Sequence, residues 1–457
     1  MLGNHLSRLR HNMRVSTADA TSFGVMVGVG ETYLPAFALA VGLGEVTAGL
    51  VGSLPLLIGG VLQAISPWIL RKGVSEQVWV VGASILQGCA FIPLIIAAIH
   101  GQMTLVGLMI CASLYWAGGL AGGPAWNSWI DKLIPKPIRA NYFAGRTRAA
   151  QIATCCGFLG AGAVLQFSRN GGWETHAFAI LFAVAWLARA CSVGMLALHR
   201  SPQAKPSQTT RPRLEQNPAH SSSVVAAVPR VVSARNLIIY LALVQGMVQV
   251  SGPFYTPYML KHLHIGYLGF ATLIATAFIA KIIALSRWGE VAKRQGAQRL
   301  LLLGGALIVP APMLWIVSSN YFWLLGVQTL SGIGWAAYEL GFFLMLFESV
   351  PIAGRVRLLT IYNLANTSAW CIGATLGGLL LHQMGTSSLG YYTLFAISTV
   401  GRSAALIFLL SCCGEAVQAL QHSGRRLLRL PQPQKVPELL SAQPSTVLTS
   451  GRQDLAA

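Results

Sequence analysis

Long apolar stretches, separated by short polar gaps, dominate this chain of 457 residues, and almost all of its positive charge lies in every second gap. Each stretch is long enough to cross a bilayer, because about 20 helical residues span a hydrocarbon core of about 30 Å. The twelve stretches are 17–40, 46–70, 78–99, 103–130, 149–167, 177–198, 237–260, 266–286, 300–317, 321–347, 358–381 and 389–412. This pattern predicts an all-α membrane protein with 12 transmembrane helices.

Charge placement predicts the orientation of these helices. Of the 32 Lys and Arg, all but five lie in alternate gaps or in the terminal segments, on the side that holds both chain ends. Two of the exceptions, Arg169 and Lys261, lie in gaps on the opposite side, and the other three are Arg189, Lys281 and Arg402 within the spans. Because cytoplasmic loops carry an excess of Lys and Arg, both termini are predicted to be cytoplasmic. We expect a multi-pass protein of the cell membrane, the inner membrane of a bacterium.

The formal net charge of +19 would suit nucleic-acid binding in a soluble protein, but 54% of these residues are hydrophobic and only 10% are charged. Basic residues spread over alternate loops are better explained by an anionic membrane leaflet. We therefore expect the lipid bilayer, and no nucleic acid, as a partner. The eight cysteines lack metal-type spacing, and no phosphate-binding loop or zinc-protease motif occurs. The sequence predicts no cofactor, no metal site and no enzymatic activity.

Polar segments divide the chain into domains. Residues 200–235 are rich in Pro, Ser, Gln and Arg, so they are predicted to form a flexible cytoplasmic linker between two six-helix bundles, 17–199 and 236–413. Residues 1–16 are predicted to form a short cytoplasmic N-terminus. Residues 414–457 are polar and are predicted to form a disordered cytoplasmic tail.

The two bundles show an internal repeat. The clearest match joins the first and seventh spans, where Gly30–Pro35 corresponds to Gly252–Pro257, and four further matches follow in order, among them Arg189 with Arg402. Six spans in each half, with both ends on one side, make the halves parallel repeats about an axis along the membrane normal.

With this organisation the chain resembles the major facilitator superfamily of secondary transporters over residues 17–413. The loop between the eighth and ninth spans is similar to the family's loop motif, and its candidate gating residues are Gly289, Lys293, Arg294, Gly296 and Arg299. Lys293 stands where the family usually has Asp. The equivalent loop of the first half retains Pro67 and the run Arg71–Gly73, so Arg71 and Gly73 are counted with the motif.

A second resemblance concerns Glu348 and Arg355 after the tenth span, which are similar to a sugar-porter pattern. The corresponding pair in the first half, Asp131 and Arg139, has a different spacing. Drug exporters of the family typically carry an Arg in the fourth span and a Gly-Pro element in the fifth, and this chain has neither. The resemblance implies a secondary transporter and leaves its solute open.

Glu31 is the first candidate for a substrate or coupling group. A charge near the middle of a span costs at least about 2.5 kcal/mol and must face protein or water. Val27 lies one turn before Glu31 on the same helical face, and its repeat partner in the seventh span is Gln249. On that span Gln245 lies one turn before Gln249. The repeat thus turns Glu31, Gln245 and Gln249 toward one central space, with Tyr33 of the repeated segment as a further candidate. The alternative is a neutral Glu31 that bonds a neighbouring helix.

Spans ten and eleven each carry a polar stripe at helical spacing. The candidate cavity-lining residues are Gln328, Trp335 and Glu339 on the tenth span and Asn363, Thr367 and Trp370 on the eleventh. Stripes of this kind suit a water-filled cavity, and hydrogen bonding between helices is the alternative.

The cations within the spans are predicted to be structural. Arg189 and Arg402 occupy matching depths, and Lys281 is close enough to the cytoplasmic end of its span to snorkel. A carboxylate such as Glu31 or Glu339 would offset the cost of burying a cation.

A cytoplasmic set of charges is predicted to close one face of the protein through ion pairs between helices. Its members are Asp131, Arg139, Arg146, Glu348 and Arg355. The alternative is a solvated charged face that follows the positive-inside bias.

These features together predict a monomeric secondary transporter that binds one small solute near the midplane and exposes it to each side in turn. Coupling to protons or another ion is expected, with a slight preference for efflux. Uptake of a sugar or other organic nutrient is the alternative within transport. A sensor or assembly protein with a transporter fold and no flux is the alternative of another class.

Overall fold

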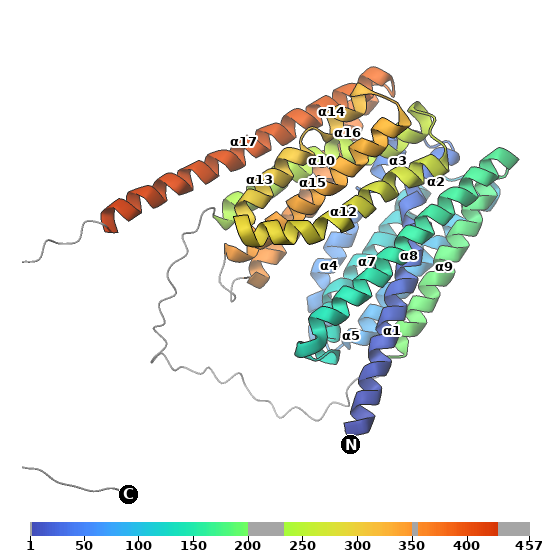
Figure 1. Cartoon of the computed structure of the whole chain (residues 1–457). Coiled ribbons are helices and arrows are strands. Elements are labelled where there is room, and N and C mark those ends of the chain that lie inside the picture. Colours follow the sequence, from blue (N-terminus) through green and yellow to red (C-terminus); the bar gives the residue numbers. More distant parts are fainter. Residues whose placement is uncertain (1, 200–232, 350–354, 428–457) are drawn as a thin grey trace, which may run out of the picture.

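The computed structural model describes residues 2–199, 233–349 and 355–427, and the secondary structure in these ranges is helical (Figure 1). Its helices form 12 segments that are long and apolar enough to cross a membrane, as the sequence predicts. The predicted linker, apart from its last residues, and the end of the predicted tail lie outside the described residues.

The first six segments form the first half. They are α1 (Leu2–Val29) with η1 (Glu31–Tyr33) and α2 (Leu34–Ala40), α3 (Glu45–Leu50) with α4 (Pro55–Arg71), α5 (Glu76–Cys89) with α6 (Phe91–His100), α7 (Leu105–Leu133), α8 (Lys136–Gly171) and α9 (Glu174–Ala197). Two of these segments are divided into shorter helices next to a proline. Pro35 and Pro55 lie in the first turns of α2 and α4, where the missing N–H of proline is tolerated.

The other six segments form the second half. They are α10 (Ala234–Ser251) with η2 (Gly252–Phe254), α11 (Tyr255–Pro257) and η3 (Tyr258–His262), α12 (Tyr267–Gln295), α13 (Ala297–Ile308) with α14 (Ala311–Val317), α15 (Tyr321–Glu348), α16 (Arg355–Met384) and α17 (Ser388–Leu427). The seventh segment breaks at Gly252, which is the position that the repeat pairs with Gly30, where the first segment breaks.

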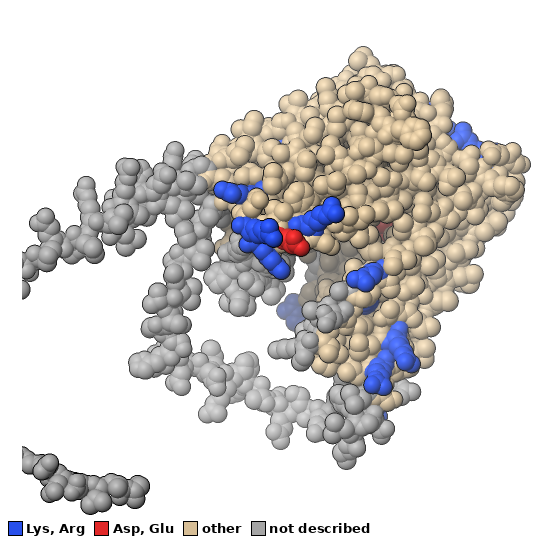
Figure 2. Space-filling view, viewed as in Figure 1, with Lys and Arg blue, Asp and Glu red and all other residues tan. Residues whose placement is uncertain are grey.

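The ends of the helices define two faces. The terminal face contains Leu2, where α1 begins, and Arg71, Ala197 and Gln295, where α4, α9 and α12 end. The far face lies at the other end of the bundle, where α2 and α8 end. Figure 1 shows the two halves close together toward the far face and diverging toward the terminal face. Most of the basic side chains visible in Figure 2 lie toward the terminal face.

Both chain ends carry more helix than the sequence predicts. α1 begins at Leu2, within the predicted N-terminal segment 1–16, and α17 continues to Leu427, within the tail predicted to be disordered. In both places no proline interrupts the chain, so the hydrogen bonding of the adjacent span continues outward.

Glycines allow the closest helix contacts in each half. A Cβ added at Gly28 of α1 would lie 2.2 Å from the carbonyl oxygen of Thr154 in α8. A Cβ added at Gly373 of α16 would lie 2.1 Å from the carbonyl oxygen of Gly246 in α10. Small residues at such contacts let helix backbones approach in lipid, where dispersion forces hold the bundle together.

We predict that Gly28→Ala lowers the free energy of unfolding by about 1–3 kcal/mol, because the new methyl group must displace backbone of α8. Gly82→Ala is the matched control, since nothing lies within 4 Å of a Cβ at Gly82. We expect this control to be neutral or slightly stabilising. Thermal unfolding of both variants in detergent measures the effect, and equal unfolding temperatures would contradict the close contact.

Candidate functional site

The apolar core is shared between the halves at one face and divided at the other. The largest cluster of buried apolar residues contains both Phe37 of the first half and Phe254 of the second. Toward the terminal face two smaller clusters replace it, one around Trp129 in the first half and one around Leu346 in the second. The halves are thus joined by the seam, the shared core near the far face, and separated toward the terminal face.

Aromatic rings and small residues form the middle of the seam. The Tyr33 hydroxyl donates to the carbonyl oxygen of Phe158 in α8 over 2.8 Å, and the ring of Phe270 from α12 packs edge-on against Tyr33 at 6.0 Å. Gly162 of α8 lies directly against Ala271 of α12. Tyr33, a candidate site residue from the sequence, is fully buried and therefore packs the seam instead of lining an open cavity.

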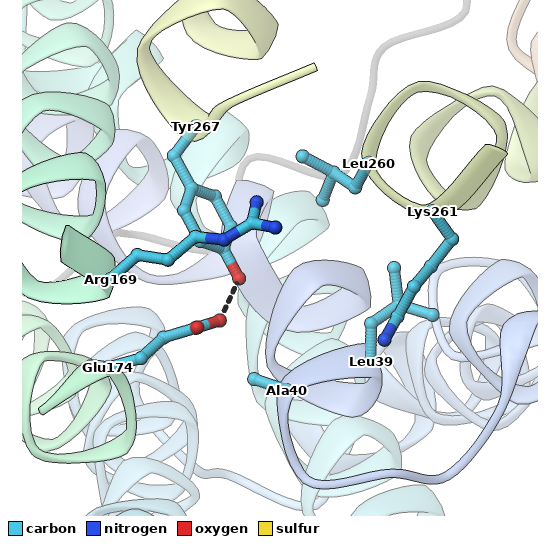
Figure 3. Close-up of a pocket in the computed structure, with 7 residues that line it drawn as sticks. All are labelled: Leu39, Ala40, Arg169, Glu174, Leu260, Lys261 and Tyr267. Atoms are coloured by element: carbon cyan, nitrogen blue, oxygen red, sulfur yellow. Dashed lines mark hydrogen bonds between the residues drawn. The ribbon is translucent and has the colours of Figure 1, made fainter. Parts of the chain in front are cut away.

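Two hydrogen bonds cross the seam at the far face. The Tyr267 hydroxyl of the second half donates to Glu174 of the first over 2.5 Å (Figure 3). The Tyr391 hydroxyl, also of the second half, donates to Glu45 of the first. Each of the four residues lies in the first turn of its helix, and we call the two bonds the Tyr–Glu clasps.

The clasps follow the internal repeat, although sequence reasoning did not single them out. Glu45 follows Gly30 at the same separation at which Tyr267 follows Gly252, so these two residues are repeat equivalents. Glu174 is the first residue of α9, whereas Tyr391 is the fourth residue of α17, so this second pair matches only to within about one turn. A carboxylate in the first half and a phenol in the second thus occupy equivalent positions at Glu45 and Tyr267, and extending the repeat register to these helix starts would have revealed this pair.

Glu31 lies in η1, at the break in the first segment. The hydroxyl of Tyr115 in α7 donates to its carboxylate, and Tyr115 is itself buried against Phe91 with ring centroids 5.5 Å apart. Among the described side chains, no Lys or Arg lies within ion-pair distance of Glu31. The carboxylate is therefore held by a neutral donor alone.

The polar residues of α10 and α16 meet in the second half. The indole N–H of Trp370 donates to the Gln245 side-chain oxygen over 3.1 Å, and Gln249 lies one turn further along α10, half-buried. The methyl group of Thr367 lies 3.4 Å from the place where a Cβ on Gly60 of α4 would stand. This stripe of α16 thus faces the first half, while Asn363 at its terminal-face end is exposed.

The stripe on α15 contains an ion pair. Lys281 of α12 contacts the Glu339 carboxylate at 2.7 Å, and both side chains are partly exposed. Trp335 is half-buried with its ring against Tyr338, and Gln328 is buried. Lys281 was expected to snorkel toward the terminal face, but it turns to Glu339, because a carboxylate across the helix contact offsets its charge directly.

Arg189 belongs to a buried network that sequence reasoning missed in part. Its guanidinium donates to Ser192 over 2.9 Å and to Ser84 over 3.0 Å, and the Ser192 hydroxyl donates to Asp19 over 2.7 Å. Asp19 also pairs with Arg146 at 3.1 Å. Asp19 is a second carboxylate in the first span, three turns before Glu31, and that position was its only signal in the sequence.

The equivalent arginine of the second half has a different environment. Arg402 is 4% exposed and donates to the carbonyl oxygen of Ile308 over 3.0 Å and to the Ser251 hydroxyl over 3.2 Å. Among the described residues no carboxylate pairs with it. The matched arginines therefore hold helices together in both halves, with a carboxylate nearby only in the first.

The predicted cytoplasmic ion pairs fall largely on side chains outside the described part of the chain, namely Asp131, Arg139, Glu348 and Arg355. Arg146 is described, and it pairs with Asp19 inside the first half.

The loop-motif residues lie at the terminal face as expected. Gly73 and Gly296 have φ of 93° and 84°, which favours glycine, and each follows the end of a helix. Gly289 lies in α12, the Arg71 side chain donates to the Pro67 carbonyl oxygen, and three basic residues are exposed: Lys293, Arg294 and Arg299. Among the described residues, no group of three or more His, Cys, Asp and Glu side chains could hold a metal ion.

Solved structures with the same fold are transporters of different solutes. A mutant of the nucleoside transporter NupG is 13% identical, with a TM-score of 0.66 over 88% of this chain and 99% of that one. A bacterial homologue of the iron transporter ferroportin is 14% identical in its inward-facing state, with a TM-score of 0.65 over 89% and 99%. The same homologue in its outward-facing state is 15% identical, with a TM-score of 0.55 over 89% of this chain and 99% of that one.

No curated protein sequence matches the chain. The family model for the Major Facilitator Superfamily does match it, over residues 124–374 and 237–412, which together cover more than half of its length. Twelve membrane-crossing helices in two repeated halves agree with this match. The chain therefore belongs to the major facilitator superfamily.

Proposed function

We propose that this protein is a secondary transporter that carries a small solute across the cell membrane by alternating access, and that its structure is the inward-open state. The observation that carries the proposal is the division of the apolar core, which is continuous between the halves at the far face and separate toward the terminal face. The higher TM-score with the inward-facing ferroportin homologue supports the same state. The excess of Lys and Arg toward the terminal face supports a cytoplasmic location for that face.

The charges around the centre favour Glu31 as the coupling group. Glu339 is already neutralised by Lys281, so it can stay ionised throughout a transport cycle. Among the described residues Glu31 accepts a side-chain bond from Tyr115 and forms no ion pair, so its negative charge would have no counterion when the cavity closes over it. An uncompensated carboxylate in a low-dielectric site is neutralised by a proton or by a cationic solute. Gln249 and the Trp370–Gln245 pair, on the other half, would supply hydrogen bonds and a ring to the solute.

A screen for the solute tests the transport function itself. We expect at least one small metabolite to raise the unfolding temperature of the purified protein and then to exchange across the membrane in a counterflow assay with proteoliposomes. Metabolites that bind without any flux would contradict transport and favour the sensor alternative.

We predict that Glu31→Gln abolishes accumulation of the solute against its gradient but leaves counterflow exchange within about ten-fold of the wild-type rate. The amide keeps the shape of the side chain and can still bond Tyr115, but it binds no proton. Uptake driven by a pH gradient, measured beside exchange without one, separates the two effects. Glu339→Gln is the control, and it should retain its response to the pH gradient. A Glu31→Gln protein with wild-type pH dependence would exclude Glu31 as the coupling group.

We further predict that the Tyr–Glu clasps close the far face. Removing the hydroxyl in Tyr267→Phe or Tyr391→Phe should shift the equilibrium toward an open far face by about ten-fold, because a hydrogen bond to a charged group contributes about 1.5–3 kcal/mol. Amide exchange at the first turns of α3 and α12 should then accelerate.

Tyr321→Phe is the matched control for the clasps. Tyr321 donates to the carbonyl oxygen of Gly269 over 3.2 Å, and both residues belong to the second half. Its loss should leave the exchange of α3 unchanged. If the clasp variants exchange no faster than this control, the clasps contribute nothing to closure.

A further inference from the structure

A cavity of about 150 Å³ lies on the seam at the far face (Figure 3). Both halves contribute to its wall, and the residues that line it are Leu39, Ala40, Arg169 and Glu174 from the first half and Leu260, Lys261 and Tyr267 from the second. It lies apart from Glu31, which does not line it.

The charges of this cavity are unbalanced. In the described chain, Arg169 and Lys261 are the two Lys or Arg residues in the gaps at the far face, and both line this one cavity from opposite halves. Glu174 is the one carboxylate in its wall, and it accepts a hydrogen bond from the Tyr267 hydroxyl (Figure 3). Among the described residues, neither cation forms an ion pair.

Lys261 also faces a second, larger cavity beside the first. This cavity has a volume of about 540 Å³ and is lined by Glu45 and His382, among others. The Glu45 carboxylate accepts the hydrogen bond of Tyr391, so it is held in a clasp as Glu174 is. Each of these carboxylates thus accepts a bond from a phenol, and within the described chain neither forms an ion pair with Arg169 or Lys261.

We propose that the cavity between Arg169 and Lys261 binds a small oxyanion, a phosphate or carboxylate group, which bridges the two halves and stabilises the closed far face. Without an anion, two positive charges on opposite halves repel across the seam and favour its opening. With an anion, each cation gains a charge-assisted hydrogen bond that exists only while the halves are together. The ligand thus couples to the conformational equilibrium through its preference for one state.

Two sources could supply this chemistry, a free anion in solution and the headgroup of an anionic lipid in the far leaflet. The cavity lies at one end of the membrane-crossing helices, where α9 and α12 begin, and its cations are exposed. The site goes beyond the proposed transport function, because its test requires no knowledge of the transported solute.

Hydrogen exchange of the full chain in an uncharged detergent, with inorganic phosphate as the probe, tests the proposal. We expect phosphate to slow amide exchange in residues 38–46 and 258–268, which flank the cavity on the two halves. Arg169→Gln and Lys261→Gln should each weaken the apparent affinity for phosphate about ten-fold or more, the effect of losing one charge-assisted bond. Arg287→Gln, which removes an exposed arginine near the terminal face, is the matched control and should leave the affinity unchanged.

A second arm distinguishes the two sources. In phosphate-free nanodiscs of phosphatidylcholine with and without phosphatidylglycerol, protection that requires phosphatidylglycerol and disappears in the variants identifies the headgroup as the ligand. Equal protection in the wild type and in the Arg169→Gln, Lys261→Gln double variant would overturn the site, and so would a wild type that neither anion protects. Exchange in α15 reports whether each variant is folded.

Discussion

The closed seam at the far face is the constraint on which the other features of this structure depend. Aromatic packing around Tyr33 and Phe270 excludes water between the halves, and the Tyr–Glu clasps seal its outer edge. Because the halves meet there and separate toward the other face, we expect polar side chains on their facing surfaces to be reached from the terminal face. Glu31 lies in η1, just inside the seam, and the proposed transport cycle requires that it be reached from one side of the membrane at a time.

The ionisable groups within the spans divide into those with a counterion and those without. Lys281 with Glu339 and Arg146 with Asp19 are paired, which offsets the cost of their burial and keeps their charge constant. Glu31 accepts a hydrogen bond from a phenol and forms no ion pair with a described Lys or Arg. Arg402 bridges helices without a described carboxylate, so charge pairing is one of two ways in which buried cations stabilise the bundle, and Glu31 is proposed for coupling because it is a carboxylate without a described counterion.

Hydropathy and charge placement predict the number of helices and their division into halves, because both are properties of position along the chain. They do not give the rotation of one helix against another, so the sequence identifies Glu31 as a candidate but not Tyr115 as its partner. Lys281 illustrates the same limit, since its depth predicted snorkelling whereas its neighbour across the helix contact determines the pairing with Glu339. Asp19 was missed because its network is assembled from four different segments.

The repeat separates architecture from specificity. Residues that both halves share serve the architecture. Arg189 and Arg402 each bridge helices within their own half, and Gly30 and Gly252 mark the break in the first membrane-crossing segment of each half. Glu31 has no such counterpart, because Pro253 stands at the equivalent position of the second half. A solute that lacks two-fold symmetry can be recognised only by an asymmetric cavity. We therefore expect selectivity and coupling to arise at residues that break the repeat, and the residues that keep it to support the packing of each half.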